Sequence, residues 1–255
     1  EGSVNEILNN FGKASIVTAS NVFAHSDELV NIAKESFRLL DNNGQFIIEV
    51  QYLLDTMNDM TFDNIYHEHV NYWSILSLNN FFNKLNAKLF KVEKINTHGG
   101  SIRIFITKDQ NKKTDKSVED FLNKEKELGL DKFKIYEEFS KKVYEIKNNV
   151  KKNISNLKSN TKTIVGYGSP AKATTALNFY NISEEVDFII EDNSLKHEKF
   201  LPGVKIPIKS KKFLKDKPDY LIVLAWNFFE DIKNNNKDLA KNIISIKDLE
   251  NINFK

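Results

Sequence analysis

The 255-residue sequence contains no cysteine, which excludes disulfide bonds and thiolate metal sites within it. It lacks any apolar run long enough to span a membrane, and it does not open on a leader in which basic residues precede apolar ones. An excess of one charge is also missing, because 37 basic residues stand against 35 acidic ones. Such a balance does not indicate a nucleic-acid partner. We therefore expect a cytoplasmic protein that binds neither membranes nor nucleic acid.

The hydrophobic content, 40% of the residues, is sufficient for one large core or two smaller ones. Residues 14–22 (ASIVTASNV) are apolar and β-branched, which predicts a buried parallel strand. A helix capped by Ser26 should follow and end at residues 42–44, before a strand at 45–50. Strand, helix and strand in this order predict the right-handed crossover unit of an α/β sheet.

Further along, residues 77–86 predict a helix, and residues 89–96 and 102–107 predict two strands. The glycine pair in the intervening Thr97-His98-Gly99-Gly100-Ser101 indicates a hairpin-like turn. These elements would form one edge of the first sheet, with an antiparallel final strand.

The polar residues 109–116 mark a boundary that two helices follow, at 117–127 and 131–158. Ser117 and Asp120 have the spacing of a capping box at the start of the first helix. The second helix carries apolar residues at steps of three and four, which predicts a long connector with one buried face. The residues of this face are Tyr136, Phe139, Val143, Ile146, Val150, Ile154 and Leu157.

A second α/β pattern begins near residue 162. A strand at 163–168 enters a glycine turn, a helix follows at 171–180, and further strands are expected at 186–191, 220–225 and 243–246. We therefore expect an α/β protein in three segments, which are 1–110, a helical connector at 111–160, and 161–255.

The densest group of proton-transferring residues is Tyr66-His67-Glu68-His69. Proton transfer next to a reacting carbon requires such groups on a rigid scaffold. A plain surface loop with two histidines is the alternative interpretation. A metal pair of His67 and His69, with Glu68 or His25 as a third ligand, is another, but no further ligand cluster supports it.

Asn21 and His25 follow the first predicted strand, at the edge where open α/β sheets bind ligands. The Tyr66–His69 segment follows the strand at 45–50, which should run parallel beside the first. Both groups are therefore expected to face the same crevice.

The motif Gly166-x-Gly168-x-x-Ala171 follows a predicted strand and opens a helix, with Tyr167 between the glycines and Lys172 just beyond. Glycines let the backbone approach a ligand, and a helix N-terminus presents free amides to phosphate. Glu191 and Asp192, at the end of the next strand, have the spacing of a dinucleotide site. A tight strand–helix turn that needs small residues for packing explains the same glycines.

Two more segments carry polar groups that could contact a ligand. His98 to Arg103 forms a candidate anion-contacting turn, in which Arg103 would bind phosphate or carboxylate through two hydrogen bonds, with a bland turn and a surface arginine as the alternative. Trp226-Asn227 follows the strand at 220–225 and suits a base or a sugar, or equally core packing.

Seven strings together resemble the sugar C-methyltransferases that act on nucleotide-linked 4-keto deoxysugars. The strings are ASNVFAH (19–25), EVQYLLDTM (49–57), FDNIYHEHVNYW (62–73), THGGSIRIF (97–105), GYGSPAKATT (166–175), FLPGVKIPI (200–208) and LAWN (224–227). The resemblance implies a Rossmann-like methyltransferase domain, whose second half would be residues 1–110. It also implies a C-terminal α/β domain that binds the nucleotide sugar, at residues 161–255.

The same resemblance implies methyl transfer from S-adenosylmethionine to a sugar carbon. The base would be His69, with Tyr66, Glu68 and His25 beside it. A ketone acidifies the neighbouring C–H bond, and a positioned imidazole can remove that proton to give an enolate. The implied donor contacts are Ser20 and Asn21, and the implied substrate contacts are Asn21, Ser101, Arg103, Gly166, Tyr167, Gly168, Ala171 and Lys172.

The sequence departs from the family pattern in two respects. Family members begin with a Cys-rich zinc lobe and a Gly-rich donor turn, and neither occurs before Ala14. We therefore expect an incomplete, inactive portion of the enzyme, with zinc confined to the absent lobe and a central strand of the sheet left unpaired; a naturally shortened family member is the alternative. A non-catalytic nucleotide-sugar binding module and an NAD-dependent oxidoreductase that uses Gly166-x-Gly168 are the alternatives.

Overall fold

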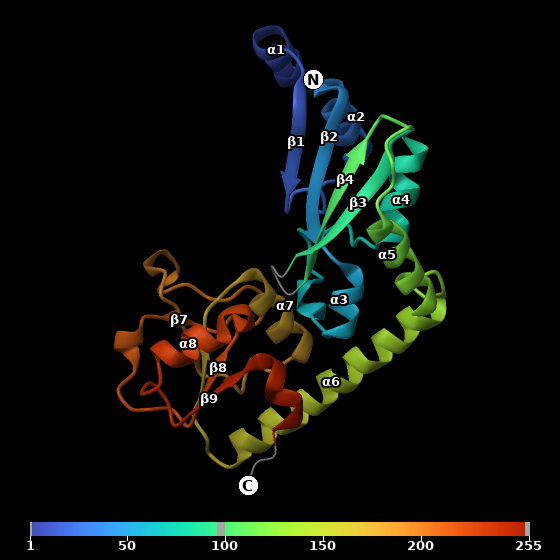
Figure 1. Cartoon of the computed structure of the whole chain (residues 1–255). Coiled ribbons are helices and arrows are strands. Elements are labelled where there is room, and N and C mark those ends of the chain that lie inside the picture. Colours follow the sequence, from blue (N-terminus) through green and yellow to red (C-terminus); the bar gives the residue numbers. More distant parts are fainter. Residues whose placement is uncertain (1, 96–99, 253–255) are drawn as a thin grey trace. The chain divides into compact units, whose positions relative to one another are not determined.

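The computed structural model describes residues 2–95 and 100–252 (Figure 1). The chain forms two compact units. The first comprises residues 1–62 and 67–139, and the second comprises residues 63–66 and 140–255. Each unit has its own sheet, so the α/β class is confirmed.

The first unit contains a four-stranded sheet in the order β1-β2-β4-β3. Its strands are β1 (Ala14–Ser20), β2 (Leu40–Gln51), β3 (Lys88–Ile95) and β4 (Ser101–Thr107). Strands β1 and β2 are parallel, whereas β4 runs antiparallel to both β2 and β3. The antiparallel final strand is therefore confirmed, whereas residues 96–99, on which most of the predicted hairpin-like turn falls, lie outside the described part of the chain.

The expectation that the first strand is buried was wrong. Strand β1 pairs with β2 alone, and Ile16 is 57% exposed. Only Val17 and Ala19 pack against the core, because alternate residues of a strand point to opposite faces. The strand thus forms a sheet edge whose second row of backbone groups points away from β2.

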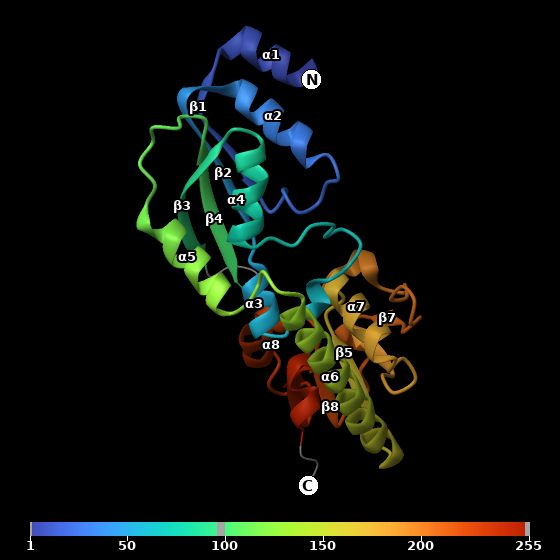
Figure 2. The ribbon, with the colours of Figure 1, turned by 90° about the vertical axis from the view of Figure 1, so that its right-hand side faces the viewer.

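Helices pack on one face of this sheet, as Figures 1 and 2 show for α2 and α4. The alternating burial of β2 matches this arrangement, since Phe46, Ile48 and Val50 lie in the core while the residues between them are half-exposed. The helices of the unit are α1 (Gly2–Phe11), α2 (Leu29–Leu39), α3 (Leu53–Asn58), α4 (Ile75–Lys84) and α5 (Lys116–Glu127).

Two predicted helix boundaries need correction. Helix α2 ends at Leu39, and residues 42–44 belong to β2, because Leu40 is fully buried and pairs with Ala14. Helix α5 is capped by Asp115, whose Oδ1 accepts from the backbone N–H of Ser117 at 2.9 Å.

The predicted capping box of Ser117 and Asp120 is therefore wrong. The Ser117 hydroxyl oxygen instead accepts from the Val92 N–H at 3.1 Å, which attaches the helix to β3. Helix α5 also presents a buried carboxylate, that of Glu125, to the start of α4.

The second unit is built on a five-stranded parallel sheet in the order β7-β6-β5-β8-β9. Its strands are β5 (Ile164–Tyr167), β6 (Phe188–Ile190), β7 (Ile208–Lys209), β8 (Tyr220–Val223) and β9 (Asn242–Ser245). Its helices are α7 (Ala171–Tyr180), α8 (Phe229–Asn235) and most of α6 (Phe133–Ser159), whose buried residues Val143 to Leu157 match the predicted face. Successive strands are added on one side of β5 and then on the other, so the topological switch point lies between β5 and β8.

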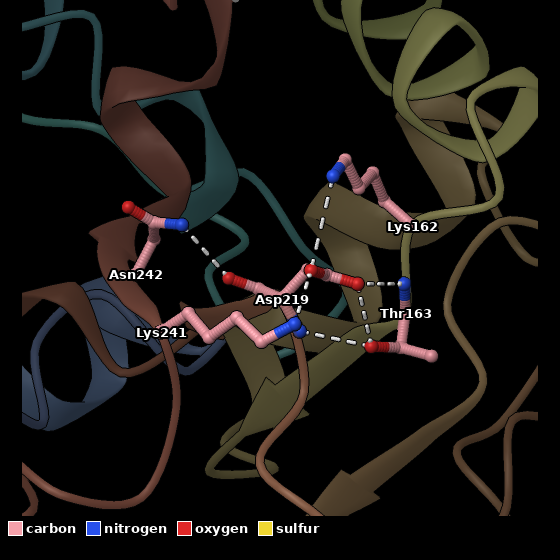
Figure 3. Close-up of polar contacts among 5 residues, drawn as sticks. All are labelled: Lys162, Thr163, Asp219, Lys241 and Asn242. Carbon is pink, nitrogen blue, oxygen red and sulfur yellow. Dashed lines mark hydrogen bonds and ion pairs between the residues drawn. The ribbon is translucent and has the colours of Figure 1, made fainter.

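The amino ends of β5, β8 and β9 are joined through Asp219 (Figure 3). Its Oδ2 accepts from the backbone N–H and the hydroxyl of Thr163, and its Oδ1 lies 3.0 Å from Lys241 Nζ. The backbone N–H of Thr163, followed by the Lys241 ammonium, lowers the pKa of Asp219 to about 2. This amino edge is thus occupied by internal contacts, and the carboxyl edge is where ligand chemistry should be sought.

Candidate functional site

The first unit brings two of the predicted histidines together. His25 lies in the loop after β1, and His69 lies in the loop that leads to α4. Their ring centroids are 4.8 Å apart at an interplanar angle of 64°. His25 is exposed and His69 is half-buried, so the pair lies at the surface of the unit rather than in its core.

Backbone and ring contacts hold the His69 loop against the His25 loop. The N–H groups of Val70 and Asn71 both donate to Ala24 O, at 3.0 and 3.2 Å. Trp73 Nε1 donates to Phe23 O at 3.2 Å, and the two rings pack with centroids 5.8 Å apart. Since Phe23 is fully buried, these contacts attach the histidine pair to the rigid core of the unit.

The other members of the predicted proton-transfer group have different surroundings. His67 Nε2 and Glu68 Oε1 lie 3.9 Å apart, and their side chains are 86% and 58% exposed. Tyr66 is half-buried and belongs to the second unit. In the described part of the chain, no three His, Cys, Asp or Glu side chains are grouped as a metal site would require.

The predicted donor contacts lie at the carboxyl end of β1. Ser20 pairs with Glu49, and Asn21 has a left-handed backbone (φ 54°) whose N–H donates to Glu49 O at 2.8 Å. Both residues are exposed. They can therefore contact a ligand that reaches this edge of the sheet.

Two predicted anion contacts have internal partners or are buried. Arg103 Nη2 lies 2.9 Å from Glu49 Oε2, and Arg103 Nη1 lies 3.6 Å from Glu93. Ser101 is fully buried at the start of β4. These surroundings explain both residues as parts of the sheet, and their role in substrate binding stays a prediction. His98 lies outside the described residues.

The glycine turn of the second unit is shaped by packing. A Cβ on Gly166 would lie 3.0 Å from Ile189 Cγ1 and 3.1 Å from Leu224 Cδ1, on the two neighbouring segments of the sheet. Gly168 has a φ of +83°, and a Cβ there would lie 3.2 Å from Ala225 Cβ. Small residues are therefore needed at both positions whether or not a ligand binds.

The backbone N–H of Ser169 in this turn already donates to a carboxylate of the same unit, that of Glu191. Glu191 Oε2 accepts from the Ser169 N–H at 2.9 Å and from its hydroxyl at 2.6 Å, and Oε1 accepts from the Asn193 N–H at 3.1 Å. Although burial opposes it, these hydrogen bonds hold the pKa of Glu191 below its usual range. The Tyr167 hydroxyl donates to Asp192 at 2.6 Å, so that residue too has an internal partner.

The carboxyl ends of β5, β8 and β9 carry a separate cationic group around Trp226. Lys172 Nζ lies 4.4 Å and Lys247 Nζ 4.9 Å from the centroid of the Trp226 ring. Lys172 also donates to Asn227 Oδ1 at 3.0 Å. The indole N–H donates to the buried carboxylate of Asp63 at 2.5 Å.

Sequence reasoning identified three of these five residues and missed the other two. Asp63 stands in the 62–73 string that pointed to the family, and its position just before the proton-transferring residues was an available signal. Lys247 follows β9 in a segment without any motif, and nothing in the sequence distinguishes it from the other lysines.

Comparison with known proteins identifies the family. The family model described as C-methyltransferase C-terminal domain matches residues 96–245, which is more than half of the chain. The chain belongs to the C-methyltransferase family. The match begins at residue 96, directly after β3, and ends with β9, so it includes the glycine turn and Trp226.

The chain is also similar to C-methyltransferase NovU of Streptomyces niveus, with 30% identity over 240 residues. The alignment covers 93% of this chain and 57% of the relative, so the chain spans a little more than half of that protein's length. Across the described part of the C-methyltransferase chain, no helix is long and apolar enough to cross a membrane.

Membership of the C-methyltransferase family favours methyl transfer over the nicotinamide-dependent alternative. The geometry of Glu191 agrees, because a dinucleotide site would use this carboxylate to bind a ribose hydroxyl. Here Glu191 Oε2 accepts from Ser169 of the glycine turn, and Oε1 accepts from the N–H of Asn193.

Proposed function

We propose that this chain forms part of an enzyme that transfers a methyl group from S-adenosylmethionine to a carbon of a nucleotide-linked keto-deoxysugar. The observation that carries the proposal is the pair of His25 and His69, whose ring centroids are 4.8 Å apart. Their loops are attached to the buried Phe23 through Trp73. A base that removes a C–H proton must be held in one position, and this loop provides such support.

His69 is the proposed base. A ketone beside the reacting carbon lowers the cost of removing its proton, and the imidazole of His69 would accept that proton to leave an enolate. His25, next to the His69 ring, is a candidate to stabilise the enolate oxygen, and Tyr66 is a second candidate. Glu68 would assist through its position beside His69 in the chain.

The residues of this chain fit only one edge of a donor site. Ser20 and Asn21 are exposed at the carboxyl end of β1, but the described strands include no Gly-rich turn of the kind that holds S-adenosylmethionine. The donor would supply an electrophilic methyl group, and the remaining contacts are expected from other parts of a full-length enzyme. We therefore expect the 255-residue chain to bind a nucleotide sugar without completing turnover.

Solvent exchange at the sugar carbon tests the base directly. A full-length enzyme that carries this chain should exchange the C–H proton beside the ketone with D₂O in the absence of donor, and mass spectrometry of the sugar measures the uptake. His69→Asn should slow exchange and methylation by about 10²- to 10⁴-fold, the usual contribution of a general base, while nucleotide-sugar binding is kept.

His67→Asn is the matched control, because it removes the same side chain two positions away, where the ring is 86% exposed. It should exchange at a rate close to that of the unaltered enzyme. If His69→Asn retained exchange within a few-fold, His69 would lose the role of base.

A non-catalytic nucleotide-sugar binding module is the second candidate, and the cationic group around Trp226 favours it because that group lies wholly within the second unit. Nucleotide-sugar binding without proton exchange or methyl transfer in the full-length protein would support this alternative.

A further inference from the structure

The cationic group around Trp226 is assembled from three separate segments of the second unit. Lys172 lies in the first turn of α7, Trp226 and Asn227 follow β8, and Lys247 follows β9. All of these segments leave the sheet at its carboxyl edge, beside the switch point between β5 and β8. Ligands of open parallel sheets bind at this location.

The charges of this group do not cancel internally. Within residues 2–95 and 100–252, no carboxylate forms an ion pair with Lys172 or Lys247, whose contacts are the Trp226 ring and, for Lys172, the neutral amide of Asn227. Burial lowers the pKa of Lys172, Asp63 partly opposes this, and the nearby Lys247 lowers it further. Two neighbouring ammonium groups over one ring, one of them half-buried, would be stabilised by an anion.

Asp63 carries the carboxylate near the two lysines, and this carboxylate accepts a hydrogen bond from Trp226. The indole N–H donates to its Oδ2 at 2.5 Å, which fixes the orientation of the ring between the segments that carry the two lysines. Asp63 is 7% exposed, and burial raises its pKa although Trp226, Lys172 and Lys247 all oppose the rise. Its carboxylate is therefore engaged by Trp226 and forms no ion pair with either lysine in the described part of the chain.

The glycine turn is a weaker candidate for the same anion. A phosphate on this turn would use the free amides that follow Gly168. The Ser169 N–H already donates to the Glu191 carboxylate, and the hydroxyl of Ser169 does the same. An incoming phosphate would have to displace one internal anion there, whereas the lysines have none to displace.

We infer that Lys172 and Lys247, with Asn227 between β8 and α8, bind the diphosphate of a nucleotide-linked ligand, and that Asp63 is a positioning residue for Trp226. This inference rests on the proposed function for the identity of the ligand. It assigns Lys247 to the site, and it moves the phosphates from the glycine turn to the lysine pair. The Trp226 ring, exposed in part beside them, supplies an apolar surface near the diphosphate.

Calorimetric titration of the 255-residue chain with UDP, dTDP and inorganic pyrophosphate tests the lysine pair. Lys172→Gln and Lys247→Gln should each weaken binding of the nucleoside diphosphates by about 10- to 100-fold, the effect of losing a charge-assisted hydrogen bond. Uridine and thymidine should show no comparable loss. Added salt should weaken binding less in either variant than in the unaltered chain.

Two further variants separate charge from folding. Lys247→Arg keeps the positive charge and should restore most of the affinity. Lys237→Gln removes one charge from an exposed position elsewhere in the unit and should leave the affinity unchanged. Equal losses in Lys237→Gln and Lys247→Gln, or full affinity in both Lys172→Gln and Lys247→Gln, would overturn the assignment.

Asp63→Asn tests the positioning residue. The amide oxygen can still accept from Trp226 Nε1, while the negative charge beside the diphosphate is removed, so UDP should bind several-fold more tightly. Asp63→Ala removes the acceptor too, and it should change the emission of Trp226 and weaken UDP binding. Identical behaviour of the two variants would refute a positioning role for Asp63.

The deuterium-exchange assay with His69→Asn keeps this inference separate from the proposed function. Exchange in the unaltered full-length enzyme that His69→Asn slows, together with unaffected binding in the lysine variants, would refute the lysine pair and leave the proposed function standing. Weakened binding in those variants together with an absence of exchange would support the lysine pair and refute the proposed function.

Discussion

Replacement of Glu125 should destabilise the first unit more than any other single charge removal on α5. Its side chain is 1% exposed, Oε1 accepts from the Ile75 N–H at 2.6 Å, and Oε2 accepts from the Leu76 N–H at 2.8 Å. The carboxylate therefore satisfies two backbone donors at the N-terminus of α4, where the helix dipole also favours negative charge. Burial, and then this nearby charge, raise the pKa of Tyr52.

The size of the effect follows from the two hydrogen bonds. Each unsatisfied buried donor costs about 1–3 kcal/mol, and the deleted side chain leaves a cavity, so Glu125→Ala should lower the free energy of unfolding by about 3–4 kcal/mol. Glu125→Gln keeps one oxygen acceptor but loses the charge, so it should cost about 1–2 kcal/mol.

Urea unfolding followed by tryptophan fluorescence measures these values. In a Trp226→Phe background the remaining tryptophan is Trp73, which is buried in the first unit, so its emission reports that unit. Glu127→Ala, at an exposed position of the same helix, is the control and should stay within about 0.5 kcal/mol of the background. A loss in Glu125→Ala no larger than in this control would refute the reasoning.

Two further predictions concern the second unit. Gly168→Ala should lower its stability by about 1–2 kcal/mol through the positive φ alone, and by more through the 3.2 Å contact with Ala225. Gly129→Ala in the first unit, with a φ of +75° and only an ordinary 3.8 Å contact with Lys132 Cδ, measures the backbone part in a thermal melt. Because the pKa of Asp219 is held at about 2, below its unfolded value of about 3.9, the stability that it contributes is present above pH 4 and is lost as the pH falls toward 2. Asp219→Asn should therefore differ from the unaltered chain in urea midpoint at pH 7 and converge with it near pH 2, and a constant difference across this range would contradict the role of the Thr163 contact.

Some elements could be predicted because their signals are local. Helix α7 begins and ends at the predicted residues 171 and 180, since Gly168 permits the turn and Pro170 favours the start of a helix. The antiparallel β3 and β4 were predicted from β-branched runs that flank a glycine-rich segment. In each case the deciding residues lie within a few positions of the element.

Other elements depended on contacts between distant segments. The start of α5 was misassigned because Ser117 contributes its hydroxyl to β3, which leaves the capping role to Asp115. The burial of β1 was misjudged because its apolar residues indicate a strand but do not reveal how many neighbours it pairs with. Hydrophobic composition alone cannot distinguish an edge strand from a central one.

The sequence by itself determined the alternation of strands and helices, the cluster of ionisable residues around His69 and the turn at Gly168, because periodicity, β-branching and glycine act over short stretches of chain. It also predicted that His25 and His69 face one crevice, but only the tertiary structure decided that their rings lie in contact and that Lys172 and Lys247 meet at Trp226. These side chains come from segments far apart in the sequence, and the order in which the strands pair determines which of those segments become neighbours.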